Sequence, residues 1–145
     1  MHRANIIVSL LLVAWCCTPR AEAQIAIIGH AALEGTTIDK NELLDLYLGE
    51  VRTWKDGTPV VLFDLPRDHD VRDAFFDYLG KRPSRMQTVW LRNLLSGDAD
   101  PPETADDEEA LLEYIRTTRG AIGFIRSQLV TDSVYVLLVI PTNSS

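Results

Sequence analysis

The stretch Arg119-Gly120-Ala121-Ile122-Gly123-Phe124-Ile125 decides the fold class, because it turns the chain out of a series of helices into a short strand. Isoleucine and phenylalanine favour strands, and the run is apolar from Ala121 onward. Its two glycines lack a Cβ, so a neighbouring segment can approach the backbone closely there. We therefore predict a strand over residues 121–125 with close neighbours.

Three other apolar runs predict further strands. Residues 25–28 are β-branched or small and lead into a glycine, residues 60–63 follow a turn signal at 55–58, and residues 134–140 form the last run. Between these runs, apolar residues at helical spacing predict four helices. This alternation of strands and helices predicts an α/β fold: a short sheet with helices on its faces.

Polar residues at the start of the helical segments predict their N-termini. Asp39 and Glu42 fit a capping box for a helix over about residues 40–48. Ser84 with Gln87 suggests a second capping box, for a helix with a buried stripe that includes Leu94 and that Gly97 ends. Thr104 is expected to cap the last helix.

The first 23 residues have the three parts of an export signal. These are a basic start at Arg3, an apolar run over residues 6–15, and the triplet Ala21-Glu22-Ala23. The run is far shorter than the roughly 20 residues that a membrane-spanning helix needs. We expect cleavage near Ala23, with residues 24–145 forming one periplasmic or secreted domain.

Two adjacent cysteines leave a second interpretation of the N-terminus open. A lipoprotein signal peptidase cuts before a cysteine, so the chain would then be lipid-anchored at Cys16 or Cys17. The bulky Trp15 disfavours that processing, which wants a small residue before the cysteine. Cleavage near Ala23 instead removes both cysteines, so that neither a disulfide nor a thiol would remain.

The charge of the expected domain is strongly acidic. Residues 24–145 hold twelve basic and twenty acidic residues, a net charge of −8. Nucleic acids and anionic membranes attract basic patches, so the overall charge disfavours both as partners. It would also repel a free anion at long range.

Five local patterns occur in order between about residues 25 and 126. They are Leu46-Tyr47-Leu48-Gly49 followed by Trp54, then Asp56-Gly57 before an apolar strand, the segment from Phe75 to Gly80, the segment from Trp90 to Gly97, and Gly120-Ala121-Ile122-Gly123-Phe124. Together they resemble the periplasmic phosphate-binding protein of bacterial ABC importers. The resemblance implies the type 2 periplasmic-binding fold. Because a complete protein of that family is roughly twice as long, it implies a reduced or single-lobe form.

The resemblance also implies a place for a ligand, in the connection after the second predicted strand. There the family provides an arginine and a serine-glycine-threonine run that hold phosphate, using free amides at a helix N-terminus. This chain lacks that run between Asp64 and Arg72. The residues at the corresponding place, which we take as candidate ligand-binding residues, are Arg67, Asp68, His69, Asp70 and Arg72.

Three interpretations of this connection remain open from the residues alone. Asp68 could cap the following helix within a solvated charge cluster. Arg67, His69 and Arg72 could retain anion binding at a helix start that faces a cleft. A cation could be held by carboxylates and imidazole, the candidates being Asp64, Asp68, His69 and Asp70.

The rest of the sequence favours binding over catalysis. It shows no Ser-His-Asp arrangement and no zinc-type spacing, so we expect no catalytic residues, no metal and no cofactor. The leading hypothesis is an exported, non-catalytic solute-binding domain whose partners are phosphate or another small oxyanion and a membrane transporter. The alternative is a non-transporting periplasmic interaction or sensory module that has lost small-ligand binding and contacts a sensor protein.

Overall fold

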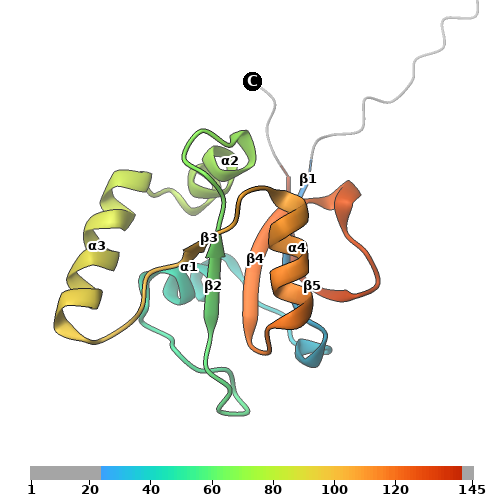
Figure 1. Ribbon diagram of the computed structural model, residues 1–145, viewed down its shortest axis with the longest axis horizontal. Coiled ribbons are helices and arrows are strands. Elements are labelled where there is room, and N and C mark those ends of the chain that lie inside the picture. Colours follow the sequence, from blue (N-terminus) through green and yellow to red (C-terminus); the bar gives the residue numbers. More distant parts are fainter. Residues whose placement is uncertain (1–23, 142–145) are drawn as a thin grey trace, which may run out of the picture.

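A five-stranded sheet in the order β3-β2-β4-β1-β5 forms the centre of the computed structural model, which describes residues 24–141 (Figure 1). Strand β2 runs parallel to β3 and β4, whereas β1 is antiparallel to both β4 and β5. The predicted α/β sheet is therefore confirmed. The predicted signal peptide, with Cys16 and Cys17, lies outside the described residues.

The elements follow the chain in nearly the predicted order. Their bounds are β1 Gln24–His30, the 3₁₀ turn η1 Ala31–Leu33, α1 Lys40–Leu48, β2 Val61–Asp64, α2 Asp70–Leu79, α3 Pro83–Ser96, β3 Glu103–Thr104, α4 Glu108–Thr117, β4 Ala121–Arg126, the 3₁₀ turn η2 Ser127–Leu129, and β5 Val134–Pro141. Strand β3 was not predicted, because two residues are too few to show a strand period.

Helices cover both faces of the sheet, and neighbouring residues of β4 show how. Phe124 stacks on Phe75 of α2 with ring centroids 3.9 Å apart, and Tyr47 of α1 also packs on Phe75. The neighbouring position, Gly123, faces the opposite side of the sheet, because successive residues of a strand alternate between its faces. A Cβ there would lie against Leu111 of α4. Thus α1 and α2 pack on one face and α4 on the other. Figure 1 shows α4 in front of the sheet and α1 behind it.

The two glycines of the 119–125 stretch have the predicted function. A Cβ on Gly120 would lie 2.1 Å from the carbonyl oxygen of Pro59, and Gly120 has a φ of +82°. A Cβ on Gly123 would lie 2.8 Å from a methyl group of Leu111. Both close approaches therefore depend on glycine.

The capping predictions were right for one helix and wrong for two. Asp39 and Glu42 form the expected capping box on α1. Helix α3 instead begins after Arg82 with a proline in its first turn, a residue already suited to that position, so Ser84 is not the cap. Thr104 lies in β3, and Asp107 caps α4 through the amide of Ala110, 2.7 Å away.

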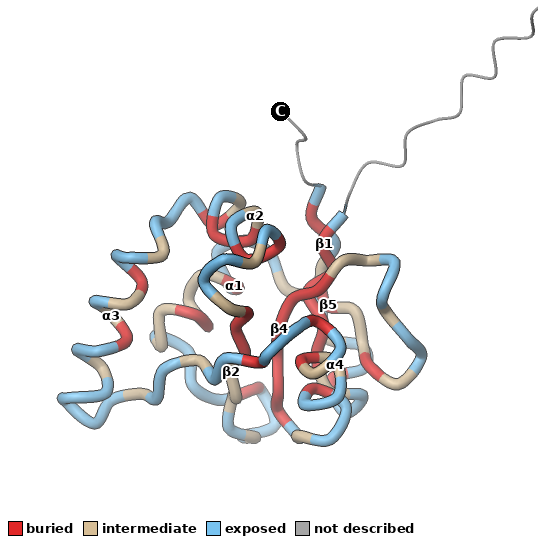
Figure 2. Tube along the Cα trace, turned by 45° about the horizontal axis from the view of Figure 1, so that its top comes forward, coloured by how far each residue is buried: buried red, intermediate tan, exposed pale blue. Residues whose placement is uncertain are grey.

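The buried apolar residues of the described part of the chain form one hydrophobic core cluster. Figure 2 shows the buried residues concentrated in the sheet and on the helix faces turned toward it. Leu94, predicted to be buried, is instead 48% exposed, because only Met86 and Trp90 of α3 face the core. No helix within residues 24–141 has the length and apolarity needed to span a membrane.

Candidate functional site

A pocket of about 190 Å³ lies beside the connection between β2 and α2. Its wall combines that connection with α3 and with the segment around β3. The lining residues are Asp64, Leu65, Arg67, Arg72, Gln87, Trp90, Pro102 and Thr104. Two of the predicted ligand-binding residues, Arg67 and Arg72, therefore meet at one hollow.

Arg72 is fixed in the pocket wall by a buried ion pair. Its Nε lies 3.0 Å from Oδ1 and 3.1 Å from Oδ2 of Asp64, and both side chains are only 4% exposed. Its guanidinium carbon lies 4.9 Å from the ring centroid of Phe76. Neither terminal nitrogen of Arg72 has a hydrogen bond to a described residue, which leaves those donors available to a ligand.

Burial raises the pKa of Asp64, while the charge of Arg72 opposes that rise. Asp64 also accepts a hydrogen bond from the amide of Leu65 at 2.8 Å. The neighbouring Tyr47 is fully buried, and burial, with Asp64 nearby, raises its pKa well above the ordinary value. Tyr47 therefore stays a neutral donor, to the carbonyl oxygen of Phe63 at 2.8 Å.

Arg67 forms the exposed side of the pocket. With the amide oxygen of Gln87 turned toward it, that oxygen accepts hydrogen bonds from Nε and Nη2 of Arg67 at 3.2 and 3.0 Å. The contact ties the β2–α2 connection to α3 and holds the guanidinium at the rim. Gln87, predicted to belong to a capping box, instead positions an arginine.

The charges of the pocket favour an anion over a cation. Two arginines face it against one carboxylate, Asp64. A larger hollow of about 350 Å³ shares Trp90 with it, but that hollow has the opposite balance. Its charged lining residues are Arg52, Asp98, Asp100 and Glu103. The smaller pocket is therefore the better anion site.

The start of α2 differs from the expected anion-binding helix terminus. His69, not Asp68, caps the helix, and its Nδ1 accepts from the amide of Val71 at 3.3 Å. The amides of Arg72 and Asp73 donate to the carbonyl oxygen of His69. These three amides already have partners, so an anion in the pocket would depend on side chains.

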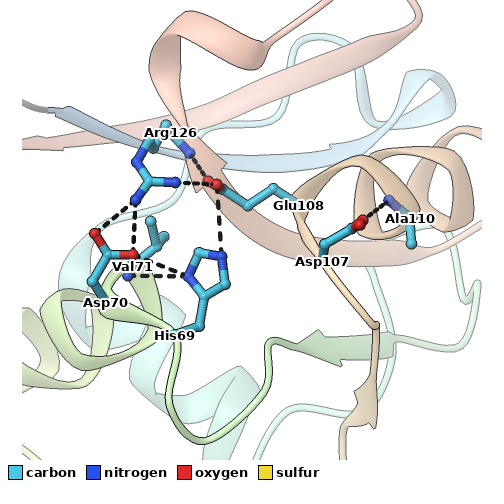
Figure 3. A network of polar contacts seen from close by, with 7 residues as sticks. All are labelled: His69, Asp70, Val71, Asp107, Glu108, Ala110 and Arg126. Atoms are coloured by element: carbon cyan, nitrogen blue, oxygen red, sulfur yellow. Dashed lines mark hydrogen bonds and ion pairs between the residues drawn. The ribbon is translucent and has the colours of Figure 1, made fainter.

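A polar network on the other side of the connection joins α2, α4 and β4 (Figure 3). Glu108, 7% exposed, accepts hydrogen bonds from the amide and from the guanidinium of Arg126. Arg126 also pairs with Asp70 at 2.6 Å, and Nε2 of His69 lies 3.7 Å from Glu108. The network ties the β2–α2 connection to β4 of the sheet. Within it, Arg126 pairs with two carboxylates, those of Asp70 and Glu108.

The structure thus divides the five predicted site residues. Arg67 and Arg72 line the pocket, whereas His69 and Asp70 belong to the network. Asp68 is exposed and lies in neither group. A ligand-binding role for the five residues stays a prediction.

The cation interpretation receives no support from the described residues. Within residues 24–141, no group of three or more His, Asp or Glu side chains is arranged to hold a metal ion. Asp64 faces Arg72, and Asp70 faces Arg126.

Sequence reasoning missed the contributions of Gln87, Thr104, Glu108 and Arg126. One signal was available for Arg126, which directly follows the predicted strand 121–125. Because β2 and β4 are parallel, their carboxyl ends meet at the same edge of the sheet, and side chains that follow them lie close together. No comparable signal places Gln87, which lies on a helix whose packing is set by tertiary contacts.

Comparisons with solved structures give the fold a context. The chain superposes on a protein from Clostridium perfringens described as a phosphate ABC transporter substrate-binding protein, solved with bound phosphate, with a TM-score of 0.67 and 21% identity. The match covers 79% of this chain and 44% of that one. An ABC-type phosphate transport receptor from Vibrio cholerae matches with a TM-score of 0.63 and 17% identity, over 79% of this chain and 45% of the other.

A third structure, PstS from Borrelia burgdorferi, matches with a TM-score of 0.59 and 14% identity, covering 85% of this chain and 48% of that one. No protein-family model and no curated protein matches the sequence. The chain spans less than half the length of these three proteins. The resemblance inferred from sequence is therefore confirmed at the level of fold: the chain has the fold of one lobe-sized portion of the type 2 periplasmic binding proteins, as found in phosphate-binding proteins of ABC importers.

Proposed function

We propose that this chain is an exported, non-catalytic binding domain that holds a small oxyanion, phosphate first among the candidates, in the pocket beside the β2–α2 connection. The convergence of Arg67 and Arg72 on one pocket carries the proposal. Guanidinium groups match the oxygen geometry of phosphate and keep their charge at any physiological pH. The fold supports it too, since one protein of this fold was solved with bound phosphate.

The two arginines would contribute to ligand binding in different ways. Arg72 is preorganised by Asp64 and Phe76, so its terminal nitrogens lose little freedom when a ligand arrives. Arg67 is exposed and held only through Gln87, so it would close over the ligand from the rim. The carboxylate of Asp64 opposes a fully charged dianion, which sets a modest affinity for the site.

A thermal-shift panel on residues 24–145 tests the proposal. Phosphate and sulfate should raise the melting temperature in a phosphate-free buffer, and at 100 times the dissociation constant the stability gain is about 2.7 kcal/mol. Arg67→Ala should abolish the ligand-induced shift. Arg119→Ala is the control, because Arg119 is 68% exposed and lies outside the pocket. A panel without any shift in the wild type would contradict oxyanion binding.

One observation favours the alternative, a non-transporting interaction module. The amides of residues 71–73 already have acceptors inside the protein, so these three amides add nothing to anion binding. Under this alternative the domain would be folded, and no small anion would change its melting temperature. It would then associate with a transporter or sensor protein through its surface.

Export is part of the proposal and has its own test. The described part of β1 starts at Gln24, so cleavage after Ala23 would keep every described residue of the sheet. Mass spectrometry of the chain secreted by an expression host should show Gln24 as the first residue. A chain that begins with a lipid-modified Cys16 or Cys17 would instead establish the lipoprotein alternative.

A further inference from the structure

Helix α3 and the two residues before it carry a charge opposite to that of the rest of the chain. Residues 81–96 hold four basic residues and no acidic one, whereas the remainder holds the other ten basic residues and all 21 acidic ones. The four are Lys81, Arg82, Arg85 and Arg92. The overall charge of −7 conceals this segregation.

Three leucines are exposed on the same helix. Leu91, Leu94 and Leu95 are 57%, 48% and 79% exposed, and their spacing of three and four residues places them on one continuous stripe. The core-facing side of α3 is formed by Met86 and Trp90, so the stripe is not needed for internal packing. Figure 1 shows α3 at one end of the molecule, at a distance from β1 and β5, and Figure 2 shows its outer turns exposed.

Two arginines of α3 lie beside this leucine stripe, and neither is paired with a carboxylate among the described residues. Arg85 and Arg92 are two turns apart, hence on the same side of the helix, and neither has an ion pair within residues 24–141. Lys81 and Arg82 are less free, because they line a hollow together with two aspartates of α2. The cations nearest the stripe are therefore the ones available to a partner.

We propose that the outward face of α3, defined by Arg85, Leu91, Arg92, Leu94 and Leu95, docks reversibly on a bilayer surface that contains anionic lipid. A stripe of leucines rimmed by arginines is the arrangement by which a helix lies in the interface, with its apolar side chains at the acyl boundary and its cations at the phosphates. Charge complementarity selects this partner, since the face is cationic and carries no acid.

The acidic remainder of the chain does not prevent this contact. At physiological ionic strength the Debye length is about 8 Å, so carboxylates on α4 and beyond are largely screened from a bilayer that touches α3. Asp98 and Asp100, which follow shortly after α3, are nearer and weaken the contact at its C-terminal end. The overall negative charge disfavours anionic membranes for the chain as a whole, but the α3 face is locally positive. The contact is small, so binding is expected to be weak and reversible.

Vesicle co-sedimentation tests the proposal. It uses residues 24–145, which include the whole hydrophobic core cluster of the described residues and lack the apolar run 6–15. The wild type should bind vesicles of 70% phosphatidylcholine and 30% phosphatidylglycerol at low salt, and pure phosphatidylcholine far less. The double variant Arg85→Gln/Arg92→Gln should lower the partition coefficient about 25-fold, because each cation contributes about fivefold. The double variant Leu91→Ser/Leu95→Ser should lower it as well.

A matched control separates a specific face from net charge. Arg116→Gln/Arg119→Gln makes the same change in charge at exposed arginines outside α3 and should leave the partition coefficient within about twofold of wild type. Equal losses in both arginine double variants would overturn the proposal, as would a wild type that ignores anionic vesicles. Melting curves of each variant verify folding, and because neither arginine of the α3 face lines the oxyanion pocket, the two proposals fail independently.

Discussion

Two ion-pair systems flank the β2–α2 connection and hold their charges in opposite ways. In the inner pair, Asp64 and Arg72 are each 4% exposed and lie inside the pocket wall. In the outer network, Asp70 is 78% exposed and pairs with Arg126, which in turn pairs with Glu108. A run that looks like one acidic and basic cluster in the sequence is therefore two systems, one that shapes a pocket and one that anchors the connection.

The largest expected effect comes from breaking the inner pair. Asp64→Ala leaves Arg72 buried without a counter-ion, which should reduce the free energy of unfolding by about 3–5 kcal/mol in urea denaturation. Asp68→Ala is the matched control, because Asp68 is exposed and should change stability by less than about 0.5 kcal/mol. Similar losses in both variants would contradict the assignment of two distinct systems.

Removal of Glu108 should have the next largest effect. Glu108→Ala takes away the acceptor for both the amide and the guanidinium of Arg126, at a cost of about 2 kcal/mol. Glu109→Ala removes a neighbouring exposed carboxylate from the same helix turn and serves as the control. Equal losses of stability in Glu108→Ala and Glu109→Ala would contradict this, because they would show that the outer network acts only through surface charge.

The cap on α2 should contribute less. His69→Ala removes the acceptor for the amide of Val71 and should cost about 1 kcal/mol. His69→Asn, which keeps an acceptor at the cap, should recover most of that loss. Identical stabilities for the two variants would argue that His69 acts through Glu108 and not as a cap.

Asp70 should have the smallest effect on stability but the clearest effect on its pH dependence. Hydrogen bonding to Arg126 holds the pKa of Asp70 below 3.8, so its contribution is full above pH 3.8 and is lost as the pH falls. Asp70→Asn should cost less than about 1 kcal/mol at pH 7, since the pair is exposed. The variant should also lose less stability than the wild type between pH 4 and pH 2.

Asp64 should show the opposite sign in the same titration. Burial raises its pKa above 3.8, so the folded state keeps the proton to higher pH than the unfolded chain does. Its contribution to the free energy of unfolding therefore decreases as the pH rises through the range above 3.8. Asp64→Asn should remove that decrease, whereas Asp73→Asn, an exposed change on α2, should not.

The sequence predicted the sheet, the four helices and their order because these depend on local pattern. Apolar period, capping residues such as Asp39 and the two glycines of residues 119–125 are all visible along the chain. Ser84 and Thr104 were wrongly predicted as caps. Both are residue types that cap helices and both lie near a helix start, but Arg82 and Asp107 occupy the cap positions. Type alone does not fix which neighbouring residue becomes the cap.

The site was less predictable because its parts come from separate elements. The place of the pocket followed from the resemblance, and Arg67 and Arg72 were found there. Which carboxylate neutralises which arginine depends on burial and on strand register, and no spacing rule reveals either. Glu108 in particular lies in the first turn of α4, where an acidic residue needs no partner elsewhere, yet it is buried and paired with a residue 18 positions away.

The proposed oxyanion site is the pocket lined by Arg67, Arg72 and Gln87. Titration of ¹⁵N-labelled protein with inorganic phosphate tests it most directly, with amide and side-chain shifts followed by NMR. If phosphate binds there, saturable shifts are expected at residues 65–72, at the Trp90 indole and at Thr104, and Arg67→Ala should abolish them. Unchanged spectra at millimolar phosphate, or shifts that leave these positions untouched, would contradict it.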